Sequence, residues 1–324
     1  MTTHPIPPGS RDILPEEMSE LRRLEDSMRA VFERYGYGEV ATPTIEYHEV
    51  IAQGAASPYR FFDESGELLA LRSDMTVPIA RLVASRFGEV EPPYRLSYIG
   101  SAYRAVRPQR GQAREFRQAG VELIGADAPD GTAEVIEVLV AALDAAGLGR
   151  AVIGLGDADL YRQLLDELGV AGEPRQAVLD CLATHDLVGL EAAVDEIDGL
   201  DGGARKTLLR LPGLRGDRSV LDRAHELGGG AVERASARLA ATYDALVERG
   251  VGDRIRLDLG LLRDLGYYTG AIVEVYDPAL GHVLGGGGRY DELMGRFGRS
   301  LPAAGFALYT ERIHIAQAEE EALR

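Results

Sequence analysis

The sequence predicts an α+β protein with a mostly antiparallel sheet flanked by helices and interrupted by a helical insertion. Short apolar segments bounded by Gly, Pro and Asp recur before residue 125 and again after residue 250, as in strands joined by turns. Between about Gly172 and Gly250 the composition changes to Leu, Ala, Asp, Glu and Arg with helical periodicity. We therefore expect a discontinuous core domain, residues 1–171 and 251–324, and a helical insertion domain, residues 172–250.

The first half of the chain begins with an amphipathic helix. Over Glu16–Tyr35 the apolar residues recur at helical spacing, with Pro15 at the entry and Gly36 just past the end. Four strands are then predicted, at Glu39–Tyr47, Leu69–Ser73, Tyr94–Arg104 and Arg114–Gly125. The remaining elements of this half are a helix, a short strand and a helix, at Thr132–Ala146, Ala151–Leu155 and Asp157–Leu168.

The second half of the chain starts with helices and returns to strands. The predicted helices of the insertion are Arg175–Thr184, Leu187–Ile197 and Val232–Arg249. The predicted strands that follow are Arg254–Gly260, Ala271–Tyr276 and Ala304–Leu308. The glycine-rich segment Gly285–Gly288 is expected to be a loop.

Charge and cysteine content narrow the class of protein. The 324 residues carry a formal net charge of -17, which disfavours a surface that neutralises many nucleic-acid phosphates. The single cysteine, Cys181, can form neither an internal disulfide nor a spaced metal-ligand set. No export signal or membrane-spanning stretch is evident. We expect a cytoplasmic protein without a metal, a cofactor or a membrane anchor.

Five arginines form the densest basic patch, and its size suits one small polyanion. They are Arg104, Arg107, Arg110, Arg114 and Arg117. The patch could hold a phosphate-bearing ligand or the acidic surface of a partner, and a solvated basic strand is an equally open reading.

The segment Arg114–Gly125 reads as a strand with polar groups on one face. Strand alternation places Gln118, Gly120 and Glu122 on that face, an amide and a carboxylate that flank a glycine. Because glycine has no side chain, it would leave room for a ligand between them. The alternative is the solvated face of an edge strand, and alternation alone does not decide between the two.

Six segments share their order and spacing with a known family. They are PPGSRDILP at Pro7–Pro15, LRSDMT at Leu71–Thr76, YRAVRPQRGQAREFRQ at Tyr103–Gln118, LRDLGYYTG at Leu262–Gly270, LGGGGRYD at Leu284–Asp291 and GFALYTERI at Gly305–Ile313. Together they resemble the histidyl-tRNA synthetase branch of the class II aminoacyl-tRNA synthetases. The resemblance implies the antiparallel sheet of that class and runs over almost the whole chain.

The resemblance implies a histidine-binding pocket and no catalytic residues. Asp74, where synthetases usually have glutamate, should face the α-amino group with Thr76 and Gln118. Glu122 and Tyr268 should hold the imidazole, and Arg263 the α-carboxylate. Alternatives remain open: the tyrosines could be core aromatics, Arg263 an ion-pair partner and Asp74 a helix cap. The implied histidine-binding residues are Asp74, Thr76, Arg104, Gln118, Glu122, Arg263, Tyr267 and Tyr268, with the backbone of Gly286–Gly288.

The nucleotide side of the site departs from the family. Val106 stands where active synthetases have an acidic residue, and Gln112 stands where a phosphate-directed arginine is usual. Arg312 is kept, but Tyr309 replaces a small residue and could crowd the place of the nucleotide. Few residues follow Arg312, so no anticodon-binding domain is expected. Loss of groups that stabilise charge on the phosphates argues against adenylation.

Within that branch, a core with a helical insertion, the segments LRSDMT and YYTG, and no expected anticodon-binding domain most resemble the regulatory subunits of ATP phosphoribosyltransferase. The resemblance implies a non-catalytic subunit that activates a short-form catalytic subunit in histidine biosynthesis and mediates histidine feedback, without tRNA. It also implies a homodimer, with Arg11–Leu14 and the next helix at its interface, inside a hetero-oligomer. Gly285–Gly288 and Leu262–Gly270 would close over histidine. The alternatives are a minimal histidine-activating ligase and a scaffold with a dead pocket.

Overall fold

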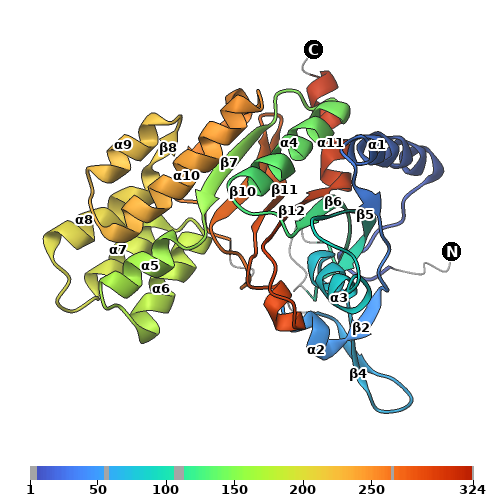
Figure 1. Cartoon of the computed structure of the whole chain (residues 1–324), viewed down its shortest axis with the longest axis horizontal. Coiled ribbons are helices and arrows are strands. Elements are labelled where there is room, and N and C mark those ends of the chain that lie inside the picture. Colours follow the sequence, from blue (N-terminus) through green and yellow to red (C-terminus); the bar gives the residue numbers. More distant parts are fainter. Residues whose placement is uncertain (1–5, 55–57, 106–112, 264–265, 323–324) are drawn as a thin grey trace.

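The computed structural model describes residues 6–54, 58–105, 113–263 and 266–322. A nine-stranded sheet runs through its centre (Figure 1). In spatial order its strands are β1 (Gly38–Glu39), β5 (Tyr94–Tyr103), β6 (Glu115–Ile124), β12 (Ala303–Tyr309), β11 (Leu280–Arg289), β10 (Ala271–Asp277), β7 (Val152–Asp157), β9 (Ile255–Asp258) and β8 (Arg215–Gly216). Only β1–β5 and β7–β9 pair in parallel within this sheet. The predicted α+β class with a mostly antiparallel sheet is confirmed.

Helices cover one face of this sheet and form its main core. They are α1 (Pro15–Arg34), α4 (Asp130–Ala145), α10 (Gly230–Glu248) and α11 (Thr310–Ala322). α1 packs against α4 and α11, while α4 lies on β6 and β12 (Figure 1). Phe32 of α1 meets Phe306 of β12 edge to face, with ring centres 6.0 Å apart. The helix predicted at Glu16–Tyr35 therefore exists and buries the apolar stripe that predicted it.

A second core lies on the other face and supports the candidate site. α3 (Thr76–Arg86) packs there against the short helix η3 (Met294–Phe297). Val77, Ile79 and Val83 of α3 are fully buried. α3 was not predicted from the sequence. Its Pro78 lies in the first turn, where proline is well tolerated.

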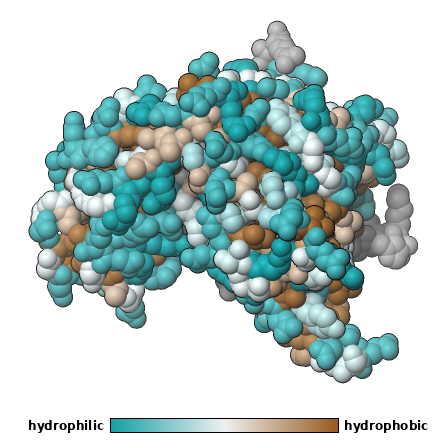
Figure 2. Space-filling model, in the orientation of Figure 1, coloured by the Kyte–Doolittle hydropathy of each residue, from teal (hydrophilic) through white to brown (hydrophobic). Residues whose placement is uncertain are grey.

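A small antiparallel sheet protrudes beside this core. It consists of β2 (Ile45–Tyr47), β4 (Leu68–Leu71) and β3 (Arg60–Phe62), next to α2 (His48–Ile51). The single strand predicted at Glu39–Tyr47 is thus wrong, since β1 and β2 belong to different sheets. Figure 2 shows hydrophobic residues at the surface of this part of the molecule, where Phe62 is 72% exposed.

Helices fill the predicted insertion. α5 (Leu160–Glu167) leads into α6 (Gly172–Ala183), α7 (Leu187–Asp195), α8 (Gly202–Arg210) and α9 (Ser219–His225), gathered on the left of Figure 1. α10 returns to the core and packs against α4 and α5, and β8 extends the main sheet. Apolar contacts thus run continuously from the core into the insertion. The division into two domains stays a prediction.

The glycine-rich segment is not a loop. Gly285–Gly288 lies inside β11, where Gly286 pairs with Glu274 of β10 and with Ala307 of β12. A side chain at Gly287 would lie 2.7 Å from the Cα of Phe306. The glycines therefore permit close backbone packing inside the sheet rather than a turn. The prediction of a loop is therefore wrong for this segment, and its closure over a ligand stays a prediction.

Candidate functional site

Seven of the eight predicted residues line one small cavity. They come from four parts of the chain: the start of α3, the segment after β5, the middle of β6 and the segment before β10. The seven residues are Asp74, Thr76, Arg104, Gln118, Arg263, Tyr267 and Tyr268. The fold thus brings residues almost 200 positions apart in sequence to one place.

The cavity is small in this arrangement. Its volume is about 30 Å³, whereas ligand pockets usually measure about 300–1,000 Å³. Side chains fill the space between the strands, so a ligand must displace some of them. Lining residues that the sequence analysis left without a pocket role include Ser73, Tyr98 and Tyr290. Tyr290 belongs to the LGGGGRYD segment, so its motif could have indicated it.

Three polar atoms of cavity-lining residues are buried without a hydrogen-bond partner in the described part of the chain. They are Oε1 of Gln118, Nε of Arg104 and Oγ of Ser73. Gln118 is only 3% exposed. A buried unpaired polar group costs about 1–3 kcal/mol, so a role that compensates this cost is expected. An amide acceptor, a guanidinium donor and a hydroxyl around the same small space suit a polar ligand.

β6 is a central strand, which settles one alternative from the sequence. It lies between β5 and β12, and Gln118, Gly120 and Glu122 are all buried. The reading of these residues as the solvated face of an edge strand is therefore wrong. The room expected beside Gly120 is also absent: a side chain there would lie 2.6 Å from the Tyr98 hydroxyl, so the Tyr98 ring occupies this space.

Glu122 lies behind the cavity wall rather than in it. Thr76 Oγ1 donates to Glu122 Oε1 at 2.7 Å, and the Tyr290 hydroxyl donates to Oε2. The side chain is 1% exposed, and burial raises the pKa of its carboxyl to about 8. The structure thus connects Glu122 to the cavity through two hydroxyls. The predicted direct grip on an imidazole would require one of these hydroxyls to move aside.

Asp74 caps α3, which is the alternative role considered for it, and it also lines the cavity. Its Oδ1 accepts from the Val77 backbone amide at 2.9 Å, within the first turn of α3. Burial raises the pKa of this carboxyl, while the Val77 amide and the Arg104 guanidinium oppose that rise. A helix-capping carboxylate held at a cavity wall is fixed in position and can also meet an ammonium group.

Arg263 lies flat against the sheet beneath the cavity. Its Nη1 donates to the Val273 carbonyl at 3.2 Å and lies 3.7 Å from Glu274 Oε1. A side chain at Gly286 would overlap this guanidinium, so the glycine gives Arg263 its place. The ion pair with Glu274 is long, which leaves guanidinium donors for a carboxylate ligand. Its neighbours in sequence, Asp264 and Leu265, lie outside the described residues.

Three tyrosines form an aromatic wall. Tyr267 contacts Tyr268 with ring centres 4.9 Å apart, and Tyr290 with centres 5.8 Å apart. All three are buried. The alternative of core aromatics therefore holds together with the pocket reading, because these rings both pack in the second core and line the cavity.

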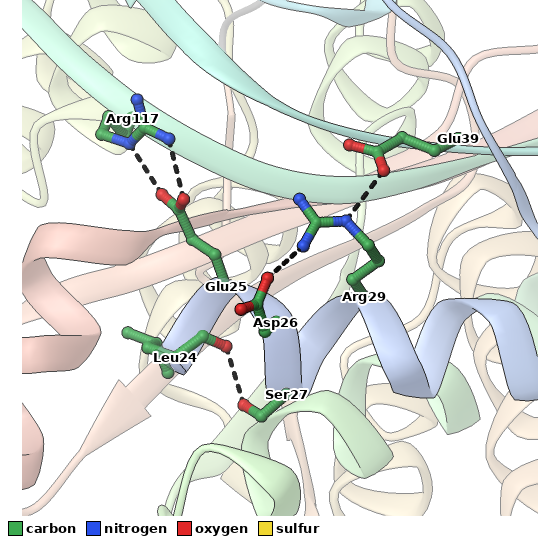
Figure 3. Close-up of polar contacts among 7 residues, drawn as sticks. All are labelled: Leu24, Glu25, Asp26, Ser27, Arg29, Glu39 and Arg117. Carbon is green, nitrogen blue, oxygen red and sulfur yellow. Dashed lines mark hydrogen bonds and ion pairs between the residues drawn. The ribbon is translucent and has the colours of Figure 1, made fainter. Parts of the chain in front are cut away.

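A larger cavity adjoins the first one on the side of the N-terminal segment. Its volume is about 840 Å³, and Arg104 and Tyr309 line both cavities. Arg117 at its edge is neutralised by Glu25, with two hydrogen bonds of 2.7 and 2.8 Å (Figure 3). Arg104 and Arg117 of the predicted basic patch thus lie in different environments. Val106, Arg107, Arg110 and Gln112 lie outside the described residues.

The raised pKa of Glu122 predicts how stability varies with pH. The pKa of the Glu122 carboxyl is about 8 in the folded chain and about 4.5 in the unfolded chain. Its contribution to the free energy of unfolding is therefore fully present below pH 4.5 and is lost as pH rises towards 8. Glu122→Gln has no carboxyl at this position, so its free energy of unfolding does not show this loss. The free energy of unfolding of Glu122→Gln relative to the unsubstituted chain should therefore grow by up to about 1.4 kcal/mol per pH unit between pH 5 and 8.

Urea unfolding at unit intervals from pH 5 to 9 measures this difference. Glu226→Gln, a change at an exposed glutamate of the insertion, is the matched control and should show no trend. Parallel pH curves for Glu122→Gln and the unsubstituted chain would show that the Glu122 carboxyl is already ionised at neutral pH.

Comparisons with known proteins agree with this fold and cavity. A family model described as histidyl-tRNA synthetase matches residues 9–313. The ATP phosphoribosyltransferase regulatory subunit of Moorella thermoacetica is 41% identical over 320 residues, covering 97% of this chain and 82% of that protein. A crystal structure described as an ATP phosphoribosyltransferase regulatory subunit/histidyl-tRNA synthetase from Bacillus halodurans is 34% identical, with a TM-score of 0.88, and the match covers 98% of this chain and 84% of that one.

A further solved structure extends the comparison. A histidine–tRNA ligase subunit from Alicyclobacillus acidocaldarius is 29% identical, with a TM-score of 0.86 and 99% coverage of each chain. The sheet and its central cavity define a protein of the class II aminoacyl-tRNA synthetase fold. The chain belongs to the family of ATP phosphoribosyltransferase regulatory subunits, which are histidyl-tRNA synthetase-like.

Neither a helix long and apolar enough to cross a bilayer nor a cluster of three or more His, Cys, Asp or Glu side chains suited to a metal occurs in residues 6–54, 58–105, 113–263 and 266–322.

Proposed function

We propose that this chain is a non-catalytic, histidine-sensing subunit that activates a short-form ATP phosphoribosyltransferase and transmits histidine feedback to it. The observation that carries the proposal is the convergence of Asp74, Gln118 and Arg263 on one buried cavity. A carboxylate, an amide and a guanidinium match the ammonium and carboxylate that every free amino acid presents. The names of the relatives support the regulatory role.

Other lining residues are the basis of the proposed selectivity for histidine. The hydroxyls of Thr76 and Tyr290 donate to Glu122, and Tyr268 lines the same cavity. An imidazole needs one acceptor and one donor for its two nitrogens; the Thr76 and Tyr290 hydroxyls can still accept, and the Tyr268 hydroxyl can donate. An aliphatic side chain of similar size would make none of these hydrogen bonds, which is a basis for its rejection.

The small volume of the cavity links occupancy to a change in the protein. A volume of about 30 Å³ is far below that of usual ligand pockets, so we expect histidine binding to move side chains of the wall such as Arg263 or Gln118. A ligand that binds only the expanded arrangement shifts the equilibrium toward it. If the catalytic subunit also distinguishes the two arrangements, the two binding events are coupled.

The proposed assembly is a homodimer within a hetero-oligomer. Arg11–Leu14 and α1 would lie at the contact between two copies of this chain. Leu14 is 68% exposed immediately before α1, and Ile6 is 48% exposed in the same N-terminal region. Covering such side chains would remove apolar area from water, at about 25 cal/mol per Å². No tRNA is expected in this assembly, and a cytoplasmic location is part of the proposal.

Histidine binding is the test of the sensing function. Titration calorimetry of the purified chain, alone and with the catalytic subunit, should show saturable binding of L-histidine. Histidinol, which lacks the carboxylate that Arg263 would meet, should bind at least about tenfold more weakly. If the chain binds no histidine, either alone or with the catalytic subunit, only the alternative of a scaffold with a dead pocket remains.

The minimal histidine-activating ligase is the second candidate, favoured by the resemblance to the Alicyclobacillus ligase subunit and by the presence of Arg104 and Arg312. It predicts that the chain catalyses histidine-dependent exchange between ATP and pyrophosphate. The proposed regulatory function predicts no such exchange. Exchange above the background of an Arg104→Ala variant would favour the ligase.

A further inference from the structure

Residues 266–270 carry two of the three tyrosines of the aromatic wall and form neither a helix nor a strand. Their backbone is held at one end by the turn that precedes α5. The Gly270 amide donates to Asp159 Oδ2 at 3.1 Å, and the Gly270 carbonyl accepts from the Ala158 amide at 2.7 Å. Gly270 has a φ of +69°, which a residue with a side chain rarely adopts. The position of the wall therefore depends on this turn.

The turn before α5 is fixed by α10. Asp157 ends β7, and its side chain is 0% exposed. Its carboxylate oxygens accept from Nε and Nη2 of Arg238 on α10, both at 2.8 Å, in a bidentate ion pair. Asp157 Oδ1 also accepts from the Asp159 amide at 3.1 Å. One guanidinium of α10 thus holds the backbone that presents the Asp159 carboxylate to Gly270.

Charge strengthens the connection between Arg238 and Asp159. Burial and the neighbouring Asp157 raise the pKa of the Asp159 carboxyl, while the Gly270 amide and the Arg238 guanidinium oppose that rise. Without Arg238, two carboxylates two residues apart would repel each other, and Asp157 would be a buried charge without its cation. The turn would then have a reason to move, and Gly270 would move with it.

α5 provides a second connection between α10 and the same segment. Arg162 of α5 donates from Nη1 to the Tyr268 carbonyl at 3.5 Å. At the other end of α5, the Glu167 carboxylate accepts from the Ala231 amide of α10 at 2.9 Å and from Arg234 Nη2 at 2.6 Å. α10 packs against both α5 and β7 (Figure 1). The last helix of the predicted insertion therefore reaches the tyrosine segment through the end of β7 and through α5.

We propose that Arg238 and Asp159 are positioning residues through which the helical insertion holds the tyrosine wall of the inner cavity in place. Both side chains lie outside the cavity wall, so they act through the backbone of residues 266–270. A partner that displaces α10 would shift Tyr267 and Tyr268, and a ligand that displaces these tyrosines would in turn shift α10. The effect on histidine affinity rests on the proposed function, whereas the hold on the segment does not.

Hydrogen exchange of the full chain, followed by mass spectrometry of peptides within residues 266–271, tests this inference. The amides of Thr269 and Gly270 report opening of the segment, because they donate to Arg289 and Asp159 at 2.8 and 3.1 Å. In Arg238→Ala their exchange should be at least about tenfold faster, as expected when hydrogen bonds to a charged group are lost.

The controls separate this local effect from a general loss of stability. Asp244→Ala on the same helix breaks an ion pair with Arg218 in which both side chains are about half exposed, so it should change the exchange by less than about twofold. β12 is the internal reference. If Arg238→Ala fails to fold, Arg238→Lys, which keeps the charge but not the parallel hydrogen bonds, should show a smaller rise in the same amides. A rise in residues 266–271 no greater than that in β12 would overturn the inference.

Titration calorimetry with L-histidine distinguishes this inference from the proposed function. Arg238→Ala should bind histidine roughly 3- to 30-fold more weakly than Asp244→Ala, the size of effect expected for coupling through residues that do not touch the ligand. Equal affinities of the two variants would overturn the inference. If the unsubstituted chain binds no histidine, the proposed function is contradicted, and the exchange of residues 266–271 still decides whether α10 holds the tyrosine wall.

Discussion

Arg263→Ala is expected to weaken histidine binding by roughly 30-fold to several thousand-fold, which corresponds to the cost of about 2–5 kcal/mol for removing one partner of a buried charge pair. Arg263 has a side-chain exposure of only 15% and is held against the Val273 carbonyl. Without it, the carboxylate of the ligand would enter a buried space with no guanidinium to meet it. Titration calorimetry at one pH and salt concentration measures the change.

The control for this prediction is Arg218→Ala. Arg218 pairs with Asp244 on the insertion, and both side chains are about half exposed, so its loss should leave histidine affinity within about twofold. Arg263→Lys should recover part of the affinity, because it restores a charge but not two parallel hydrogen bonds. If Arg263→Ala binds histidine as tightly as Arg218→Ala does, the carboxylate does not bind at Arg263.

Gly305→Ala is expected to be among the most destabilising substitutions in the chain, with a loss of roughly 3 kcal/mol or more. The added methyl group would overlap the carboxylate of Glu122 and lie 2.6 Å from the Val121 carbonyl oxygen. β6 and β12 are paired at this point, so the backbone cannot move aside without breaking the ladder. Denaturant unfolding monitored by circular dichroism measures the loss.

Two controls test the cause of this loss of stability: Gly281→Ala, and Gly305→Ala combined with Glu122→Ala. Gly281→Ala changes an exposed glycine of β11 with no atom within 4 Å of the added methyl group, and it should alter stability by less than about 0.5 kcal/mol. In Glu122→Ala the carboxylate is gone, so Gly305→Ala should cost less in that background. Equal costs in both backgrounds would show that the overlap with Glu122 is not the cause.

The sequence predicted the main sheet well because its strands carry strong local signals. The predicted strand Arg114–Gly125 corresponds to β6, and Tyr94–Arg104 corresponds to β5. Alternation along β6 also selected Gln118 and Glu122 together. It could not tell a central strand from an edge strand, because that difference depends on β12, which is almost 200 residues further along the chain.

The errors concern residues whose role depends on distant contacts. Gly285–Gly288 reads as a loop from local preference, yet the neighbouring strands β10 and β12 require glycine there. The contact of Glu122 with a ligand stays a prediction, and it too depends on distant residues, because hydroxyls of Thr76 and Tyr290 donate to its carboxylate. Local patterns indicate which groups face one side of an element. They do not indicate which side chain lies in front of another.

The assay of ATP phosphoribosyltransferase activity tests the central claim most directly. A purified short-form catalytic subunit is measured alone, with this chain, and with this chain plus histidine, in parallel with the Arg263→Ala variant. The proposed function predicts that the chain raises the rate, that histidine lowers it, and that the fractional inhibition is smaller with Arg263→Ala. A rate that the chain leaves unchanged, or inhibition that is the same with both forms of the chain, would contradict the account.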